Sequence, residues 1–223
     1  MMPGSQQWCA LLAKGALEAG LPLQLNHIEL MGRHARALLE WNRNINLTAI
    51  TDPADVAVKH FLDAIVPSHH IPWEGELLDI GTGGGFPGIP LKILRPDQPM
   101  TLIDGSRKKI NFVKHAIRIL CLEKIEALQA RAEDLADRPE NRGRFDVVVS
   151  RAVSDLAVMA RLALPLLAPQ GKLLLYQGPS ESPRQADAAM LLAPSLTLMT
   201  KVEYRLPVLG DQRTLLVIGK TVS

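Results

Sequence analysis

One glycine-rich segment constrains the fold more than any other part of the chain. Residues 77–88 read LLDIGTGGGFPG, an apolar run that ends in an acid and passes into Gly-x-Gly-x-Gly. This pattern is typical of a parallel strand that turns sharply into a helix beside a nucleotide-like ligand, because a Cβ at these glycines would block the turn or the ligand. Pro87 and Pro90 suit the first turn of that helix, where no N–H donor is needed. The segment therefore predicts an α/β fold with a ligand site at the carboxyl ends of its strands.

The acid inside the predicted strand favours one nucleotide ligand over another. Asp79 stands two residues before Gly81, where a carboxylate can face the ammonium of S-adenosylmethionine (SAM) but would repel a pyrophosphate. The same glycines also satisfy the dinucleotide fingerprint, a weak signal by itself, and a turn without any ligand is the plainest alternative. Asp104 ends the next predicted strand, where an acid can hold ribose hydroxyls of either nucleotide. We favour SAM. The expected contacts in this region are Asp79, Gly81, Thr82, Gly83, Gly85, Phe86 and Asp104.

Alternating strand and helix patterns begin near residue 71, after a stretch that looks entirely helical. In that stretch, helices are predicted over 8–19, 26–43 and 52–66, the last with Asp52 as its cap. Strands are predicted at 76–80, 99–104, 125–130, 145–150, 171–177, 197–206 and 213–219, and helices at 87–95, 106–120, 154–167 and 184–193. This order implies a parallel sheet with helices on both faces, and a turn at 209–211 makes the last strand antiparallel. We expect a seven-stranded, Rossmann-like sheet of the SAM-dependent methyltransferase type in residues 71–223, with an N-terminal helical extension in residues 1–70. The stretch 178–183 is predicted to be an exposed loop.

Composition excludes several classes of protein. The chain has 223 residues, of which 47% are hydrophobic and 22% charged, as in ordinary soluble globular domains. Its two cysteines, Cys9 and Cys121, form no Cys-x-x-Cys pair, and we expect Cys121 in the core. No signal peptide and no apolar run of about 18 residues is present. We therefore expect a cytoplasmic monomer without a metal site, a disulfide or a membrane partner.

Positive charge is unevenly spread along a chain whose formal net charge is only +2. It gathers in three clusters: Arg33, His34 and Arg36; Arg107, Lys108, Lys109, Lys114, His115 and Arg118; and Arg138, Arg142 and Arg144. Any one cluster is most simply a solvated surface. Three clusters in a chain with a predicted nucleotide site favour a polyanionic substrate.

Several motifs together resemble one family closely. They are Trp41-Asn42 with Asn46-Leu47-Thr48, His60-x-x-Asp63, the glycine loop running to Phe86-Pro87-Gly88-Ile89-Pro90, Asp104 with Lys108-Lys109, Ser150-Arg151-Ala152, and Arg213. They resemble the ribosomal small-subunit methyltransferase G family, also called glucose-inhibited division protein B. The resemblance implies methylation of guanine N7 at position 527, in the 530 loop of 16S rRNA, on the rRNA or the small ribosomal subunit. A small-molecule SAM methyltransferase with a helical lid is the main alternative; an NAD-dependent oxidoreductase and a non-catalytic RNA-binding protein are two others.

The resemblance also suggests roles for individual residues. It places cofactor contacts at Gly81, Phe86, Ala132, Glu133 and Arg151. The substrate contacts that we expect are Arg151, Gln177, Arg213, Lys108 and Lys109. The family often has a lysine at the position of Gln177, whose amide can form hydrogen bonds but brings no charge.

The chemistry of N7 methylation requires little from ionisable side chains. The N7 lone pair carries no proton, so no general base is needed and catalysis rests on positioning. Arg151 follows the fourth strand, and its planar donor fork could reach the SAM carboxylate or guanine O6; a surface arginine is the alternative. His60 and Asp63 share one helix face and either pair with each other or face the cleft.

Overall fold

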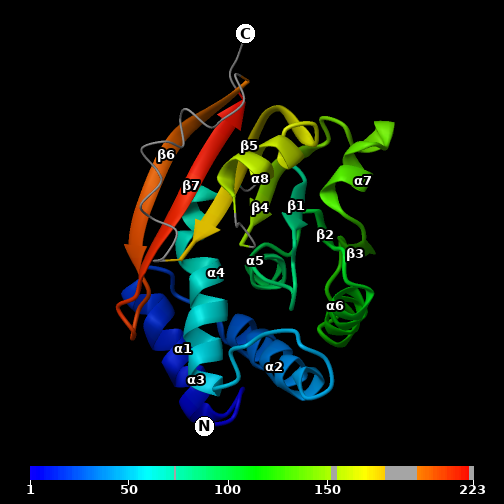
Figure 1. The fold of residues 1–223 in the computed structure, drawn as a ribbon. Coiled ribbons are helices and arrows are strands. Elements are labelled where there is room, and N and C mark those ends of the chain that lie inside the picture. The colour runs from blue at the N-terminus through cyan, green and yellow to red at the C-terminus, as the bar shows by residue number, and fades with distance from the viewer. Residues whose placement is uncertain (73, 152–154, 179–194, 221–223) are drawn as a thin grey trace.

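A seven-stranded sheet forms the centre of the computed structural model, which describes residues 1–72, 74–151, 155–178 and 195–220 (Figure 1). The strands are β1 Leu77–Ile80, β2 Met100–Asp104, β3 Ile125–Gln129, β4 Phe145–Ser150, β5 Leu167–Gln177, β6 Leu196–Arg205 and β7 Gln212–Lys220. Their order is β3-β2-β1-β4-β5-β7-β6; the first five pair in parallel, whereas β7 is antiparallel to both of its neighbours. The predicted fold class and the terminal hairpin are therefore confirmed.

The two faces of the sheet pack against different helices. Successive side chains of a strand point to opposite faces, so Val147 and Val149 of β4 join one buried cluster and Val148 joins the other. The first cluster includes α5 Gly88–Leu94, α6 Arg107–Ile119 and the N-terminal helices. The second includes α7 Ala132–Ala136 and α8 Leu156–Ala163. Both faces of the central strands β1 and β2 are thus removed from water, as their apolar runs predict, whereas the edge strand β3 is partly exposed.

The N-terminal helices lie beside the carboxyl ends of β4 and β5 (Figure 1). They are α1 Gln6–Glu18, α2 Leu25–Asn42, α3 Pro53–Val56, a π-helical segment Ala57–Leu62, α4 Asp63–Ile65 and a 3-10 turn Val66–His70. The fully buried Trp8 of α1 donates from Nε1 to Pro53 O at 2.8 Å and meets the ring of Phe61 edge-on. Arg95, buried after α5, donates to the carbonyls of Ile71 and Pro72 at 2.9 and 2.7 Å. The helices are therefore joined to the sheet by both apolar packing and polar contacts.

Several predicted boundaries differ from the structure. Helix α8 ends at Ala163 rather than 167, because Pro165 has no N–H with which to continue the helical hydrogen bonds, and β5 begins at Leu167 rather than 171. The short helix α7 was not predicted. Cys121, expected in the core, is exposed and has a positive φ of 53° just after α6 ends, so that expectation is wrong. The predicted helix at 184–193 and residues 179–183 of the predicted loop lie outside the described residues. Within the described part of the chain, no helix is long and apolar enough to span a membrane.

Candidate functional site

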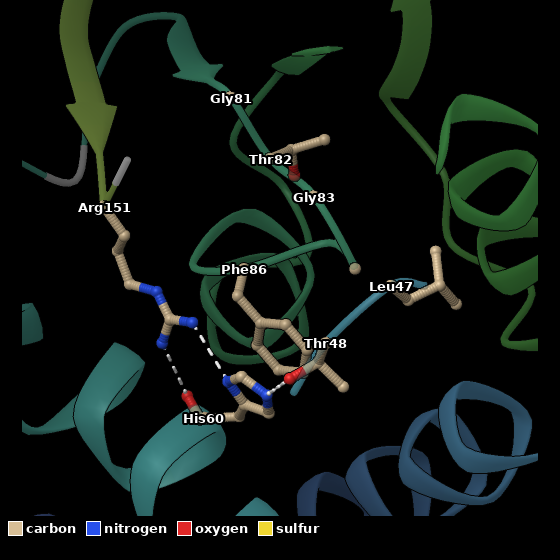
Figure 2. A pocket seen from close by; sticks show the side chains of 9 residues that line it. Leu47, Thr48, His60, Gly81, Thr82, Gly83, Phe86 and Arg151 are labelled. Atoms are coloured by element: carbon tan, nitrogen blue, oxygen red, sulfur yellow. Dashed lines mark hydrogen bonds between the residues drawn. The ribbon is translucent and has the colours of Figure 1, made fainter. Parts of the chain in front are cut away.

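A pocket of about 190 Å³ opens where β1 and β4 end (Figure 2). It is lined by Leu47, Thr48, His60, Gly81, Thr82, Gly83, Gly84, Phe86 and Arg151. Three parts of the chain meet here: the glycine loop after β1, the residue after β4, and the N-terminal segment from Leu47 to His60. Five predicted contacts are brought together, namely Gly81, Thr82, Gly83, Phe86 and Arg151. The pocket lies at the carboxyl edge of the sheet, where ligands bind in open α/β folds.

The glycines of the loop serve two different purposes. Gly81, Gly83 and Gly85 have φ values of 75°, 57° and 88°, which L side chains rarely adopt. A Cβ on Gly85 would lie 2.5 Å from Ile89 Cδ1, so this glycine permits close packing of the loop on α5. A Cβ on Gly83 would meet just the Gly81 carbonyl oxygen, at 3.9 Å, among the described atoms. The space over Gly83 is therefore open for a ligand.

Asp79 stabilises the glycine loop through hydrogen bonds from two residues of the loop. It is fully buried, and its Oδ2 accepts from the Thr82 hydroxyl at 2.7 Å and from the Gly88 N–H at 2.9 Å. Its Oδ1 is buried without a hydrogen-bond partner among the described atoms. Burial raises the pKa of Asp79 to about 6, against the opposing effect of those two hydrogen bonds. The carboxylate thus fixes the loop and keeps one acceptor oxygen for a further donor, which suits a cationic ligand group.

Asp104 fastens the loop from the neighbouring strand. Its Oδ2 accepts from the Gly83 N–H at 3.1 Å, and its Oδ1 accepts from the Ser106 N–H at 2.8 Å. Lys109 Nζ lies 3.8 Å from Oδ2. The acid predicted to hold ribose hydroxyls is therefore oriented by backbone donors, one of them on Gly83. It is not among the described residues that line either cavity, and a ribose contact stays a prediction.

A second cavity of about 270 Å³ adjoins the first. It is lined by Asn44, Ile45, Asn46, Leu47, Ser106, Lys108 and Lys109. Leu47 borders both cavities. Two of the predicted substrate contacts, Lys108 and Lys109, thus stand next to the glycine-loop pocket, on polar walls that suit an anionic ligand.

Arg151 is locked into a network and is not a surface arginine. Its side chain is 19% exposed, its NH2 group lies 3.0 Å from His60 Nδ1, and its guanidinium carbon lies 5.3 Å from the centre of the Phe86 ring. The same guanidinium contacts Asp63 Oδ2 at 3.5 Å. His60 Nε2 in turn lies 2.8 Å from Thr48 Oγ1 (Figure 2). The alternative of a solvated Arg151 is therefore wrong, and a ligand contact by this residue stays a prediction.

Asp63 connects this network to the last two strands. Its Oδ1 lies 3.3 Å from Arg213 Nε and accepts from the Tyr204 hydroxyl at 3.1 Å. Burial raises the pKa of Asp63, and Arg151 and Arg213 oppose that shift. His60 therefore lines the pocket, whereas Asp63 forms ion pairs with Arg151 and Arg213 and is not among the described residues that line it. No direct His60–Asp63 pair is found among the described contacts, so neither expectation for this helix face holds for both residues. Arg213, predicted as a substrate contact, is 12% exposed and occupied by Asp63 and Asp211.

A column of rings joins helix α2 to the glycine loop. His34 stacks on Phe86 at 4.9 Å and on Phe112 at 5.9 Å between ring centres, and His60 stacks on Phe86 at 4.5 Å. The fully buried His34 donates from Nε2 to the Gly84 carbonyl at 2.9 Å, and burial lowers its pKa to about 4. Sequence reasoning missed this contact because His34 looks like one member of a basic cluster.

The first predicted basic cluster is therefore wrong at His34, which is buried, whereas Arg33 is half-buried and Arg36 is exposed. His34 is neutral and buried, Arg33 donates to the Ile119 carbonyl, and Arg36 donates to the Pro3 carbonyl at 3.3 Å. These side chains tie α2 to its neighbours within the fold.

The third cluster lies at the opposite edge of the sheet from the pocket. Arg144 stands just before β4 and donates from Nε to Glu76 Oε2 at 2.9 Å, while Arg142 donates to the Ala136 carbonyl at 3.0 Å. The pocket residue Arg151 follows the other end of β4. The second cluster differs in its location, because its Lys108 and Lys109 line the second cavity. Four of its cations are exposed on α6: Arg107, Lys108, Lys114 and Arg118.

The remaining predicted contacts occupy carboxyl ends of other strands. Ala132 and Glu133 begin α7 after β3, with Ala132 buried and Glu133 exposed. Gln177 ends β5 opposite Thr214 of β7 and is buried. None of these is among the described residues that line the two cavities, so their contacts stay predictions.

Comparisons with known proteins identify the family to which the chain is similar. The family described as rRNA small subunit methyltransferase G matches residues 27–213. Ribosomal RNA small subunit methyltransferase G from Geobacter sulfurreducens is 43% identical over 213 residues, covering 95% of this chain and 97% of that protein. The protein of the same name from Desulforamulus reducens is 41% identical over 214 residues, covering 94% and 88%.

Solved structures match the fold at low identity. A SAM-dependent methyltransferase from Aquifex aeolicus has a TM-score of 0.58 at 15% identity, covering 77% of this chain and 94% of that one. TYW2 from P. horikoshii, in complex with MeSAdo, has a TM-score of 0.58 at 11% identity, covering 74% and 63%. These structures support the methyltransferase fold, and the sequence matches extend over nearly the whole chain. The chain therefore belongs to the rRNA small subunit methyltransferase G family.

Proposed function

We propose that this chain transfers the methyl group of SAM to N7 of guanine 527 in the 530 loop of 16S rRNA. The observation that carries the proposal is the family match over residues 27–213, which contains every residue lining the pocket and the second cavity. The pocket supports this proposal because two separate segments line it. The glycine loop is shaped for the nucleoside of SAM, and the N-terminal segment can contact the guanine.

The residues present fit SAM. The open space over Gly83 is one that a Cβ would fill, and the unpartnered Oδ1 of Asp79 is an acceptor suited to an ammonium. Gly81, Gly83 and Phe86 would hold the cofactor at the loop, and Asp104 would face its ribose. When bound, SAM supplies an electrophilic methyl group. The chain itself holds the two reactants in a fixed orientation, which lowers the entropic part of the activation barrier.

His60, the one histidine among the described residues that line the pocket, is not arranged as a general base. Both ring nitrogens of His60 are engaged, Nδ1 by Arg151 and Nε2 by Thr48. Burial, followed by the charge of Arg151, lowers the pKa of His60 to about 3. An unprotonated nucleophile such as guanine N7 needs no proton acceptor, so this arrangement suits N7 methylation better than methylation of an exocyclic amine.

Binding of rRNA is supported by the cations of the second cavity. Lys108 and Lys109 stand beside the pocket, and the exposed cations of α6 continue from them. Either the rRNA or the small ribosomal subunit, including an assembly intermediate, is the partner in this proposal. Action as a cytoplasmic monomer, and the division into a helical extension of residues 1–70 and a methyltransferase domain of residues 71–223, belong to the same proposal.

A methyl-transfer assay tests this function. It combines the purified protein with radiolabelled SAM and with either small-subunit rRNA or small subunits that lack the modification. We expect mass mapping of the RNA to place the label on one guanine. The labelled base released from that RNA should be 7-methylguanine. Label on another atom, or on a small-molecule acceptor in preference to RNA, would contradict the proposal.

A further inference from the structure

Thr48 is held in a fixed position at the mouth of the pocket. Asn42, at the end of α2, accepts from the N–H groups of Leu47 and Thr48 at 2.8 and 3.0 Å, and its Nδ2 donates to the Thr48 carbonyl at 2.9 Å. One asparagine side chain thus fixes the backbone of this segment on both sides. The Thr48 side chain, which lines the pocket, inherits that position.

The proton positions on His60 follow from its neighbours. Arg151 has donors and no acceptor, so the 3.0 Å contact of its NH2 group requires a lone pair on His60 Nδ1. The neutral ring then carries its proton on Nε2, which lies 2.8 Å from Thr48 Oγ1. His60 is therefore the donor in that contact and Thr48 the acceptor (Figure 2).

Both lone pairs of the Thr48 hydroxyl oxygen are consequently occupied by hydrogen bonds. It accepts from His60 Nε2–H and from the Ile50 N–H at 3.0 Å, which are the two bonds that its lone pairs can accept. Its own proton has no acceptor among the described residues. Since Thr48 lines the pocket, this hydroxyl can serve a bound molecule as a donor and not as an acceptor.

We propose that Thr48 is a specificity-determining residue whose hydroxyl donates to O6 of the target guanine while N7 faces the methyl group. The inference rests on the function proposed above. On the edge that carries N7, guanine presents an O6 acceptor and adenine an N6 donor. A site whose hydroxyl is restricted to donating would pair with guanine and leave an unfavourable donor–donor contact with adenine.

The position of Thr48 favours the substrate over the cofactor. Thr48 belongs to the N-terminal segment and stands across the pocket from Gly81–Gly84, the loop shaped for SAM. The adjacent Leu47 also borders the second cavity, where Lys108 and Lys109 lie. In addition, the charged Arg151 is a better partner for the SAM carboxylate than a neutral hydroxyl.

A double-mutant cycle tests this assignment, with the protein varied at Thr48 and the RNA varied at the target base. 16S rRNA would be assembled by ligation with either guanine or 2-aminopurine, which keeps N7 but lacks O6, at the target position. The readout is the ratio of kcat/KM for the two RNAs in each variant, because the intrinsic reactivity of each N7 cancels when ratios are compared between variants. We expect Thr48→Val to reduce the wild-type preference for guanine roughly three- to ten-fold, the value of one hydrogen bond.

Two controls separate this role from a structural one. Thr48→Ser should retain the wild-type preference. Thr82→Val removes another pocket hydroxyl, whose proton already goes to Asp79, so it should lower the rate without changing the preference. If Thr48→Val does not fold, Thr48→Ala replaces it, because water can then reach the two donors left behind.

Three results would overturn the inference. An unchanged preference in Thr48→Val would show that its hydroxyl does not read O6. A loss of S-adenosylhomocysteine affinity, measured by calorimetry, equal to the loss of kcat/KM would assign Thr48 to the cofactor. Wild-type protein that leaves the target guanine unmethylated would remove the proposed function itself, and this result is distinguishable because no variant is involved.

Discussion

Asp79 is an ionisable group placed where water cannot reach it. Its pKa is raised from the ordinary value of 3.8 to about 6, chiefly by burial. One pKa unit corresponds to about 1.4 kcal/mol, so the ionised side chain costs the ligand-free fold roughly 3 kcal/mol at neutral pH. That cost is absent below the unfolded pKa and grows as pH rises through the folded pKa. A cationic group bound next to Asp79 would offset this cost, so the ionised carboxylate is more stable with a cation nearby than without one.

Replacing Asp79 with asparagine should separate stability from ligand binding. In Asp79→Asn, an amide oxygen can still accept from Thr82 and Gly88, and the amide nitrogen takes the place of the unpartnered Oδ1. We expect its advantage in unfolding free energy over the wild type to grow from about pH 4 to pH 6 and then level off, while S-adenosylhomocysteine binds at least ten-fold more weakly. Denaturant titrations at several pH values and calorimetry measure both. Unchanged affinity would show that Asp79 serves the loop and not the ligand.

The residue scale also shows where sequence reasoning stops. The loop residues Gly81 and Gly83 could be predicted as pocket residues, because a strand–glycine–helix pattern has few other backbone solutions. The position of Arg151 followed from its place after a strand, but its partners His60 and Asp63 come from a segment about 90 residues earlier, and pairing at that range leaves no local pattern. His34 was misread because a histidine among arginines has the same local sequence whether it is buried or exposed.

The glycine loop, as an element, should respond differently at two positions. Gly83→Ala places a methyl group into open space, so we expect a folded protein, destabilised by about 1–2 kcal/mol because of its positive φ, with strongly reduced S-adenosylhomocysteine binding. Gly85→Ala pays the same conformational cost and also pushes against Ile89 Cδ1 at 2.5 Å, so its stability should fall further. Thermal unfolding and calorimetry distinguish the two. Intact affinity in folded Gly83→Ala would move the cofactor away from this loop.

Helix α2 supports the loop through a buried neutral histidine. The pKa of His34 falls from 6.5 to about 4 because of burial. The unfolded chain therefore binds a proton that the fold does not accept, and stability is lost as pH falls below 6.5 toward 4. His34→Phe keeps a ring between Phe86 and Phe112 but removes both this titration and the bond to Gly84.

The His34→Phe variant should accordingly be less sensitive to acid than the wild type. We expect its unfolding free energy relative to the wild type to increase by roughly 3 kcal/mol between pH 7 and pH 4, since burial lowers the pKa of His34 from 6.5 to about 4. At pH 7 it should bind S-adenosylhomocysteine more weakly, because the Gly84 carbonyl has lost its donor. Equal pH dependence in both proteins would mean that His34 is protonated within the fold.

On the scale of the whole molecule, the sheet order was predictable while the distribution of charge was not. Alternating strands and helices and a terminal hairpin specify the order of packing, because chain connectivity limits the topologies. Where the cations lie relative to the pocket depends on contacts between segments far apart in sequence, such as those of Arg33 with Ile119 and Arg144 with Glu76. The structure reduces three predicted basic clusters to one beside the pocket, on α6.

RNA binding should therefore depend on α6 and not on the opposite edge of the sheet. Each phosphate contact lowers the slope of log affinity against log salt by about 0.7 to 0.9. Neutralising Arg107 and Lys108 with glutamine should flatten that slope by roughly 1.5 units, because both cations are exposed on α6 and Lys108 lines the second cavity. The matched control, Arg138→Gln with Arg142→Gln, removes the same net charge at the amino edge and should leave the slope unchanged. Fluorescence anisotropy with labelled rRNA at several salt concentrations measures both; equal flattening by the two pairs would mean that binding follows net charge and that α6 is not the docking face.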